Sequence, residues 1–217
     1  MIKVNSAASA WIEATKYVLK NGIKYGDITE VLNGIIEIEN FSFDRNFDDK
    51  FRVVFGDKKI DYVSAFTFNT PIDTPLGRQY KAVKPGWKNT YWGRMFSFND
   101  KINQVEHVIK ILKEKKNTKR CEIIIFRPED SSSIFKQPCL LSIDFKPRRL
   151  DLYMTATFRS QRISKSGYGD YTALINFGQW LCQETEHYLK KVTVIAHSLH
   201  VANNEELKNS NLLLNML

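Results

Sequence analysis

The sequence predicts an α+β fold in which one mixed sheet is flanked by helices. Alternating apolar residues indicate two strands, over 139–145 and 149–160, and the short KPR segment between them is typical of a hairpin turn. Apolar residues recur at helical spacing over 101–115 and again over about 171–189. Strands and helices in this order favour one sheet with helices packed on it.

The remaining elements are predicted from local signals. A helix over 6–20 begins after Asn5 or at Ser6, either of which can cap it. It ends before Gly22, because glycine adopts the left-handed helix terminus at low cost. The other predicted segments are strands over 34–40, 121–127 and 192–201, loops over 41–100 with one short helix near 58–66, and a helical tail from Asn203.

Length and composition are those of a single globular domain spanning 1–217. The chain can support one substantial core, and 43% hydrophobic with 26% charged residues is ordinary for a soluble protein. Apolar runs stay shorter than the roughly 18 residues of a membrane span, and the N-terminus lacks the apolar core of a signal peptide. Three widely spaced cysteines form neither a disulfide framework nor a paired metal-ligand motif. We therefore expect a cytoplasmic protein without a metal site.

The formal net charge of +8 predicts an anionic partner. Basic residues gather over 110–120 and 146–149, where they could equally form a solvated helix end and a turn. Nucleic acid, a phosphorylated small molecule and an acidic surface are all candidates on charge alone. No recognition helix, zinc finger or RNA-binding aromatic motif accompanies the basic segments, so a nucleic-acid partner is not favoured.

Reactive and charged side chains stand at the ends of the predicted strands. Cys139 begins one strand, Arg159 and Ser160 end its hairpin partner, Asp170 precedes the long helix, and His200 closes the last strand. Each residue alone has a structural explanation; a single cysteine, for example, is more often a small core residue than a nucleophile. One sheet would bring these strand ends to a common cleft. Their combination therefore predicts a site in which Cys139 is the nucleophile.

Six short motifs stand in order between residues 91 and 202. They are YWGR (91–94), NTKR (117–120), RPEDS (127–131), PC (138–139), RS (159–160) and HVA (200–202). With them the chain resembles the thymidylate synthase superfamily, particularly its shorter archaeal-type members. The resemblance runs from Tyr91 to Glu205 and is weak in the N-terminal half. The intervals between Cys139, Arg159 and His200 fit the family without a gap.

The resemblance implies one-carbon transfer to a pyrimidine nucleotide. In this family a thiolate adds to C6 of the pyrimidine, and C5 then takes one carbon from 5,10-methylenetetrahydrofolate. Cys139 matches that thiol, and the neighbouring cation Arg159 is expected to lower its pKa from about 8.5. Arg159 and Ser160 match the residues that bind the nucleotide phosphate, a task that suits an arginine fork.

The same resemblance implies a homodimer with a shared phosphate site. Lys119 and Arg120 match a basic pair that reaches the phosphate from the other subunit. The first member is lysine here, which keeps the charge but weakens bidentate binding. The N-terminal glutamate that the family uses in catalysis has no assigned match; Glu37 and Glu39 are the candidates.

Several positions depart from the family pattern. His200 and Ala202 match a His-x-Tyr pair that binds the sugar 3′-hydroxyl, and the alanine opens room for a ribose 2′-hydroxyl. Trp92, an expected cofactor contact, replaces a tyrosine. Arg162 replaces an aspartate that touches the folate pterin, so it is also expected beside the cofactor. Asp170 replaces the asparagine that reads the base edge.

The aspartate at position 170 bears on which base is bound. An asparagine amide pairs with N3–H and O4 of uracil, whereas a protonated carboxyl can donate to N3 of cytosine and accept from its exocyclic amine. The family's cytidylate hydroxymethylases also carry aspartate at this position. The leading expectation is therefore hydroxymethylation of CMP or dCMP. Thymidylate synthesis from dUMP and a catalytically silent nucleotide-binding homologue are the alternatives.

Overall fold

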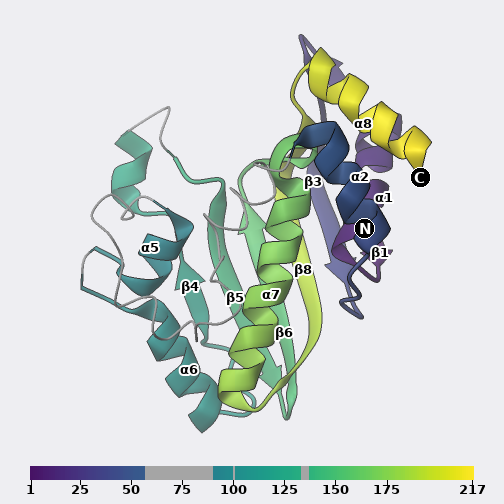
Figure 1. The fold of residues 1–217 in the computed structure, drawn as a ribbon. Coiled ribbons are helices and arrows are strands. Elements are labelled where there is room, and N and C mark those ends of the chain that lie inside the picture. Colours follow the sequence, from purple (N-terminus) through teal and green to yellow (C-terminus); the bar gives the residue numbers. More distant parts are fainter. Residues whose placement is uncertain (57–89, 100, 133–136) are drawn as a thin grey trace.

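The structure, a computed structural model, describes residues 1–56, 90–99, 101–132 and 137–217. Its strands are β1 (Ile2–Val4), β2 (Ile23–Tyr25), β3 (Ile28–Ile38), β4 (Glu122–Ile124), β5 (Leu140–Arg148), β6 (Asp151–Phe158), β7 (Gln161–Arg162) and β8 (Tyr188–Val201). Its helices are α1 (Ala7–Asn21), α2 (Arg45–Phe55), α5 (Tyr91–Phe96), α6 (Gln104–Glu114), α7 (Tyr168–Thr185) and α8 (Asn204–Met216). The described strands form one sheet in the order β1-β3-β8-β6-β5-β4, with β2 added to β3 and β7 to β8 (Figure 1). The predicted α+β fold with one mixed, helix-flanked sheet is confirmed.

The sheet is mixed because the chain crosses over through α7. β5 and β6 form an antiparallel hairpin, whereas β6 and β8 lie parallel to each other. Parallel neighbours need a long connection, and α7 supplies it. β8 then pairs antiparallel with β3, where Ile36 lies opposite Val194, and so becomes a central strand of the sheet.

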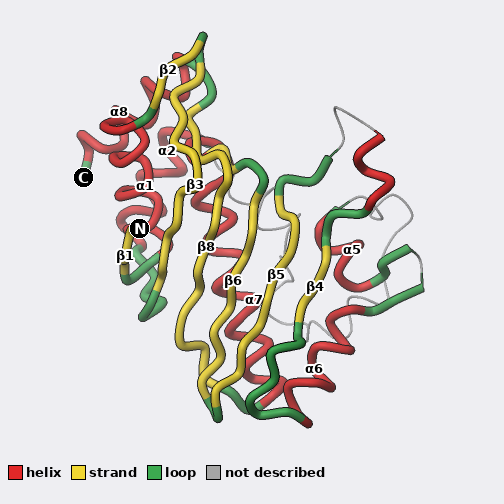
Figure 2. Tube along the Cα trace, turned by 180° about the vertical axis from the view of Figure 1, so that it is seen from behind, coloured by secondary structure: helices red, strands yellow, loops and turns green. Residues whose placement is uncertain are grey.

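The described helices lie on one face of this sheet. Side chains alternate along β6: Met154 and Phe158 are buried, while Thr155 and Thr157 on the other face are half-buried. Seen from behind, β4, β5, β6 and β8 lie in front of α5, α6 and α7 (Figure 2). Among the described elements, none covers this second face.

A second part of the core joins the N-terminal helices to the start of α7. Trp11 of α1 packs against Phe47, Phe51 and Phe55 of α2, with ring centroids 5.7, 5.6 and 5.9 Å away. The indole nitrogen of Trp11 donates to the carbonyl oxygen of Ile163 at 2.9 Å. This contact fixes the π-helical turn over 163–167, which leads directly into α7.

Several predicted boundaries are wrong: the strand predicted over 34–40 begins at Ile28, the strand predicted over 121–127 covers only Glu122–Ile124, and two further differences have a clear backbone cause. β5 continues through the KPR segment, and the hairpin turns instead at Arg149 and Leu150, because Arg149 takes a left-handed conformation (φ 58°) that reverses the chain. The long helix ends at Thr185 rather than near 189, because Glu186 terminates it with a left-handed conformation (φ 57°). β8 begins at Tyr188, so the last two residues predicted for the helix belong to this strand instead.

Two helices fall in the segment 41–100, for which mainly loops are predicted. α2 is capped by Asp44, whose carboxylate accepts from the backbone nitrogen of Phe47 at 2.9 Å. α5 is capped by Thr90, whose hydroxyl accepts from the backbone nitrogen of Gly93 at 2.9 Å. The short helix predicted near 58–66 lies outside the described residues. None of the described helices is long and apolar enough to cross a membrane.

Candidate active site

Cys139 lies immediately before β5, beside the end of β6. The backbone nitrogen of Arg159 donates to the Cys139 carbonyl oxygen at 2.8 Å, which joins the two strand ends. The Arg159 guanidinium donates from Nε to the carbonyl oxygen of Pro138 and from Nη2 to that of Gln137, both at 2.9 Å. Nη2 also lies 3.8 Å from the Cys139 sulfur. Arg159 is therefore held beside the thiol, while its Nη1 has no hydrogen-bond partner among the described residues.

The groups around the Cys139 thiol shift its pKa in opposite directions. Burial raises the pKa of the thiol, the positive charge of Arg159 lowers it, and the negative charge of Asp170 raises it again. A hydrogen bond with Tyr91 lowers it further. The net shift is upward because burial outweighs the cation. The expectation that Arg159 leaves the pKa below its ordinary value is therefore wrong, although the guanidinium does act in that direction.

Tyr91 reaches the thiol because a buried ion pair holds its helix in place. Arg94 of α5 donates from Nη2 to Oδ1 of Asp130 at 2.9 Å and from Nη1 to the other carboxylate oxygen. Nη1 also donates to the carbonyl oxygen of Ile125 at 2.9 Å. The YWGR and RPEDS motifs are thus joined inside the protein. The Tyr91 hydroxyl then accepts from the backbone nitrogen of Leu140 at 3.2 Å, next to Cys139.

Asp170 lies in the first turn of α7 and is almost fully buried. Burial raises the pKa of its carboxyl from 3.8 to about 7, and hydrogen bonds with Gln161 and Ser166 offset only part of this rise. Nε2 of Gln161 donates to Oδ2 of Asp170 at 3.4 Å, and the Tyr171 hydroxyl donates to Oε1 of Gln161 at 3.0 Å. The carboxyl can therefore exchange a proton near neutral pH while its orientation stays fixed.

His200 stands near the end of β8, opposite Arg162 of β7 in the sheet register. Its Nδ1 lies 3.3 Å from the Ser198 hydroxyl, which in turn donates to the carboxylate of Glu30. Burial lowers the pKa of the imidazole, and although Glu30 and the carboxylate of Glu206 raise it, the net shift is downward. A neutral His200 that donates from Nδ1 to Ser198 keeps a free electron pair on Nε2.

The two residues expected at the cofactor are engaged within the protein. Arg162 donates from Nε to Oε2 of Glu206 at 2.9 Å, and its Nη2 lies 2.7 Å from Oε1. Ser164 donates to the same carboxylate at 2.5 Å. The Trp92 ring is 4% exposed and stacks on Phe96 with centroids 4.1 Å apart. Nε1 of Trp92 has no hydrogen-bond partner among the described residues, but it is buried. With Arg162 paired to Glu206 and the Trp92 ring buried against Phe96, neither position presents an exposed group to a folate.

The other predicted residues lie in three separate places. Ser160 and Ala202, both half-buried, adjoin β7 and β8 near Arg159 and His200. Lys119 and Arg120 lie on the exposed loop between α6 and β4. Because Glu122 of β4 pairs with Asp144 of β5, this loop is level with the far end of β5 from Cys139. The candidates for the N-terminal glutamate, Glu37 and Glu39, lie near Lys191 instead.

Three residues at the site are missed by the sequence reasoning. Tyr91 contacts the thiol, Gln161 orients Asp170, and Ser198 contacts His200. Tyr91 opens the YWGR motif, Gln161 follows the RS motif, and Ser198 shares a strand face with His200. Each of the three stands one or two residues from a predicted site residue, and this was the signal in the sequence that could have found them. Their roles depend on contacts between segments far apart in the chain.

Comparison with known proteins finds relatives among the methanogenic archaea. The chain is 27% identical to a protein of Methanocaldococcus jannaschii named "Putative thymidylate synthase", over 92% of this chain and 89% of that protein. It is 22% identical to a Methanothermobacter marburgensis protein of the same name, over 92% of both chains. A Methanosarcina mazei protein, also so named, is 25% identical over 52% of each. No family model matches the chain.

These likenesses confirm the resemblance to the thymidylate synthase superfamily in its shorter archaeal form. They also extend it, because two of the alignments include most of the N-terminal half as well as the segment from Tyr91 to Glu205.

Proposed function

We propose that this relative of archaeal proteins named "Putative thymidylate synthase" transfers one carbon to C5 of a pyrimidine nucleoside 5′-monophosphate. One observation carries the proposal: the half-buried Cys139 sulfur lies 3.8 Å from a nitrogen of the exposed Arg159 guanidinium. A nucleophile next to an anion-binding group suits a ligand that carries an electrophilic ring and a phosphate.

The reaction begins with addition of the Cys139 thiolate to C6 of the pyrimidine. The S–C6 bond forms, the C5–C6 double bond breaks, and its electron pair moves to C5 and toward the C4 substituent. C5 then bonds to the one-carbon unit and releases its hydrogen as a proton, and tetrahydrofolate would leave as the bond between its nitrogen and that carbon breaks. Addition of water to the methylene carbon, with loss of the sulfur, restores the C5–C6 double bond. A bound methylenetetrahydrofolate would supply the one-carbon unit. Arg162 is paired with Glu206 and the Trp92 ring is stacked on Phe96, so neither is proposed as a contact of this group.

Asp170 favours cytosine as the base. A carboxyl with a pKa of about 7 is available in its neutral form near physiological pH. The neutral form can donate to N3 of cytosine and accept from the exocyclic amine, as the base requires. We therefore propose CMP or dCMP as the substrate and its 5-hydroxymethyl derivative as the product, with water as the source of the hydroxyl oxygen.

Two alternatives each have an observation in their favour. The names of the relatives favour methylation of dUMP to dTMP, in which the folate also supplies a hydride. The Arg162–Glu206 ion pair favours a nucleotide-binding homologue without one-carbon transfer, because it occupies a side chain expected at the folate.

Release of tritium from C5-labelled nucleotides separates these functions. With methylenetetrahydrofolate present, we expect release from CMP or dCMP and little from dUMP. Release from dUMP accompanied by dihydrofolate would establish the thymidylate alternative instead. A protein that binds CMP in a calorimeter yet releases no tritium from any of the three nucleotides would be the silent homologue. If tritium were released from CMP or dCMP alone, and without added folate, the result would still show that this chain activates C5.

A homodimer completes the proposed phosphate site. Between Cys139 and Lys146, the residue level with Arg120, β5 spans about 24 Å at roughly 3.4 Å per residue. This span exceeds the reach of any side chain, so Lys119 and Arg120 of one chain cannot share a phosphate with its own Arg159. A symmetric partner packed on the sheet face that the described helices leave open could bring its basic loop to Cys139.

Mixing two inactive variants tests this arrangement. Neither Cys139→Ser nor the double variant Lys119→Gln/Arg120→Gln should exchange tritium efficiently alone. After equimolar mixing and subunit exchange, half of the dimers are mixed and each holds one intact site. Activity should therefore return to about a quarter of the wild-type value. As a control, Cys139→Ser mixed with Arg159→Gln should not regain activity, because Cys139 and Arg159 belong to the same half-site. No recovery in the first mixture would contradict the shared site.

A further inference from the structure

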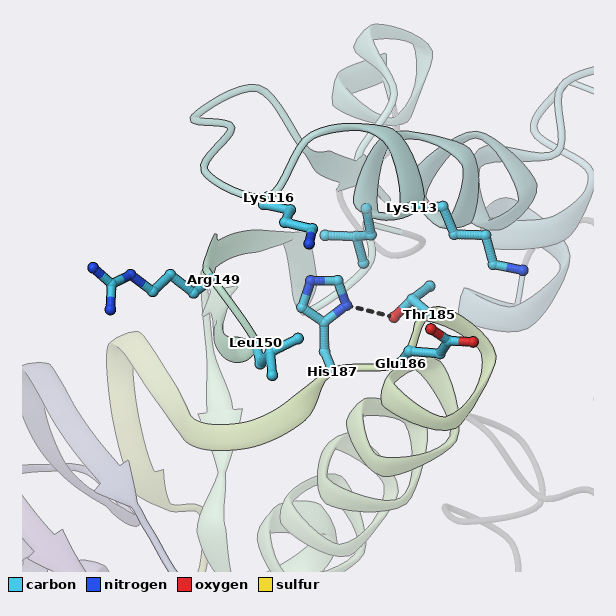
Figure 3. A pocket seen from close by; sticks show the side chains of 8 residues that line it. Lys113, Lys116, Arg149, Leu150, Thr185, Glu186 and His187 are labelled. Carbon is cyan, nitrogen blue, oxygen red and sulfur yellow. Dashed lines mark hydrogen bonds between the residues drawn. The ribbon is translucent and has the colours of Figure 1, made fainter.

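We propose that a pocket between the C-terminal ends of α6 and α7 binds a small phosphate-bearing anion, independently of the Cys139 site. The pocket has a volume of about 300 Å³ and is closed on its third side by the β5–β6 turn (Figure 3). Its size is at the low end for ligand sites, which suits a phosphate or pyrophosphate group better than a complete nucleotide.

The charge of the pocket is strongly unbalanced. Lys113, Lys116 and Arg149 line it against a single carboxylate, that of Glu186. None of these three cations forms an ion pair within the part of the chain that the structure describes. Figure 3 shows the Lys116 ammonium group directed at the His187 ring, whereas the Lys113 and Arg149 side chains start at the pocket and extend away from that ring in opposite directions. Unpaired ammonium and guanidinium groups around a concave surface are typical of phosphate binding.

The floor of the pocket is a buried histidine in a fixed orientation. The Thr185 hydroxyl donates to the carbonyl oxygen of Leu181 at 2.7 Å, so its oxygen is left to accept from Nδ1 of His187 at 3.1 Å. The other ring nitrogen, Nε2, then faces the space below Lys116 (Figure 3). It can accept from a protonated phosphate oxygen when the ring is neutral and donate to an ionised one when the ring is charged.

The walls are tied to one another, so the pocket is formed in advance of any ligand. The backbone nitrogen of Arg149 lies 3.1 Å from the Lys116 carbonyl oxygen and 3.2 Å from Oδ1 of Asn117. The backbone nitrogen of Tyr188 donates to the Leu150 carbonyl oxygen at 2.7 Å. These bonds join the loop after α6, the hairpin turn and the start of β8 around a single cavity.

The residue preferences of a tight turn do not explain why position 149 is an arginine. Arg149 occupies the first turn position of the β5–β6 hairpin with φ 58°, where glycine is the favoured residue because it has no Cβ. A charged side chain in that position is strained and, among the described residues, has no side-chain partner. An anion bound at the pocket would give this guanidinium a partner.

The pocket is distinct from the proposed substrate site but adjoins a segment that contributes to it. Arg149 lies at the opposite end of β5 from Cys139. Nη1 of Arg148 donates to the carbonyl oxygen of Thr118 at 3.3 Å, which ties the turn to the loop that carries Lys119 and Arg120. A bound anion would therefore lie beside this loop rather than beside the thiol.

Calorimetric titration of the full chain with pyrophosphate, at fixed low salt and without nucleotide or folate, tests the proposal. Lys116→Gln/Arg149→Gln should weaken binding on the order of tenfold or more, because two charge-assisted contacts are lost. The matched control Lys24→Gln/Lys208→Gln removes two exposed charges elsewhere and should bind within about twofold of the wild type. Arg149→Gly should also bind more weakly, yet melt no lower than the wild type, because glycine relieves the strained turn.

The outcomes separate this site from the active site. Cys139→Ser should bind pyrophosphate as the wild type does, whatever the result of the tritium assay. Loss of binding in Arg159→Gln, but not in the Lys116/Arg149 variant, would move the anion to the substrate site and overturn the proposal. An equal loss of affinity in the Lys24→Gln/Lys208→Gln control would show that pyrophosphate binds by general charge attraction and not in the pocket. Tighter binding of an oligonucleotide than of pyrophosphate would also overturn it.

One further titrant, a nucleoside triphosphate, identifies the source of the phosphate. A nucleoside triphosphate that binds more tightly than pyrophosphate would assign the phosphate tail of a nucleotide to the pocket. Equal affinities for the two would assign inorganic phosphates.

Discussion

Replacing Cys139 by serine is expected to abolish release of tritium from C5 of the nucleotide, by a factor on the order of 10³ or more. A hydroxyl group ionises far less readily than a thiol, so the C6 adduct that activates C5 does not form. The measurement is a comparison of initial release rates for the variant and the wild type, with labelled CMP, dCMP and dUMP each tested in turn. Retention of exchange above a hundredth of the wild-type rate would remove Cys139 from the mechanism.

A second cysteine provides the control. Cys182 lies within α7 and is 5% exposed, and burial raises the pKa of its thiol to about 12. Cys182→Ser should leave the exchange rate close to that of the wild type. If Cys182→Ser abolished exchange with an unchanged melting temperature, the reactive thiol would have been assigned to the wrong cysteine. Cys139 differs from Cys182 because the residue is only partly buried and its sulfur contacts Arg159.

Replacing Asp170 by asparagine is expected to reverse the preference between cytosine and uracil by about 100-fold or more in kcat/KM for exchange. The amide has nearly the shape of the carboxyl, so the contact with Gln161 can persist. It cannot, however, supply the hydroxyl proton that N3 of cytosine would accept, and it suits N3–H and O4 of uracil instead. The change is measured by competition of CMP and dUMP for one enzyme sample. An unchanged preference would leave no basis for choosing cytosine.

The pH profile gives this prediction a second readout. Asp170 has a pKa of about 7, so its carboxyl is neutral below that pH and loses its proton above it. Exchange from CMP should therefore lose efficiency as pH rises through about 7, while rising pH generates more thiolate at Cys139. The falling limb should be absent when Asp170→Asn acts on dUMP, because an amide does not titrate. The control is Asp49→Asn, a change of the same kind at an exposed position on α2. This variant should keep the falling limb of the pH profile with CMP.

The sequence was informative wherever local periodicity or a contiguous motif carried the signal. The helical spacing of Val105, Val108 and Leu112 indicated α6, and alternation indicated β5 and β6. At the site, the spacing of Cys139 from Arg159 correctly predicted that the two lie together. Both predictions rest on properties of one segment or of one hairpin.

Predictions failed where a distant partner decides the outcome. The phenylalanines of α2 repeat every four residues, but their helix is explained by Trp11 and Tyr168, which lie far away in the chain. The pKa of Cys139 was expected to fall because Arg159 was visible in the sequence, whereas the extent of burial was not. Likewise, nothing near Arg162 in sequence indicated that Glu206 on the last helix would bind it. Burial and long-range ion pairs are properties of the assembled fold.

The central position of β8 has a consequence for how the protein is made. β3 leaves the ribosome early, yet its antiparallel partner is a strand near the other end of the chain, as the Ile36–Val194 pair shows. Until β8 is synthesised, the backbone donors and acceptors along that edge of β3 await their partners, as do those of β6. Pairing over so long a sequence separation is slow to form. The nascent chain therefore passes through a stage with two incomplete sheet edges, and a chaperone that shields extended segments would be most useful then.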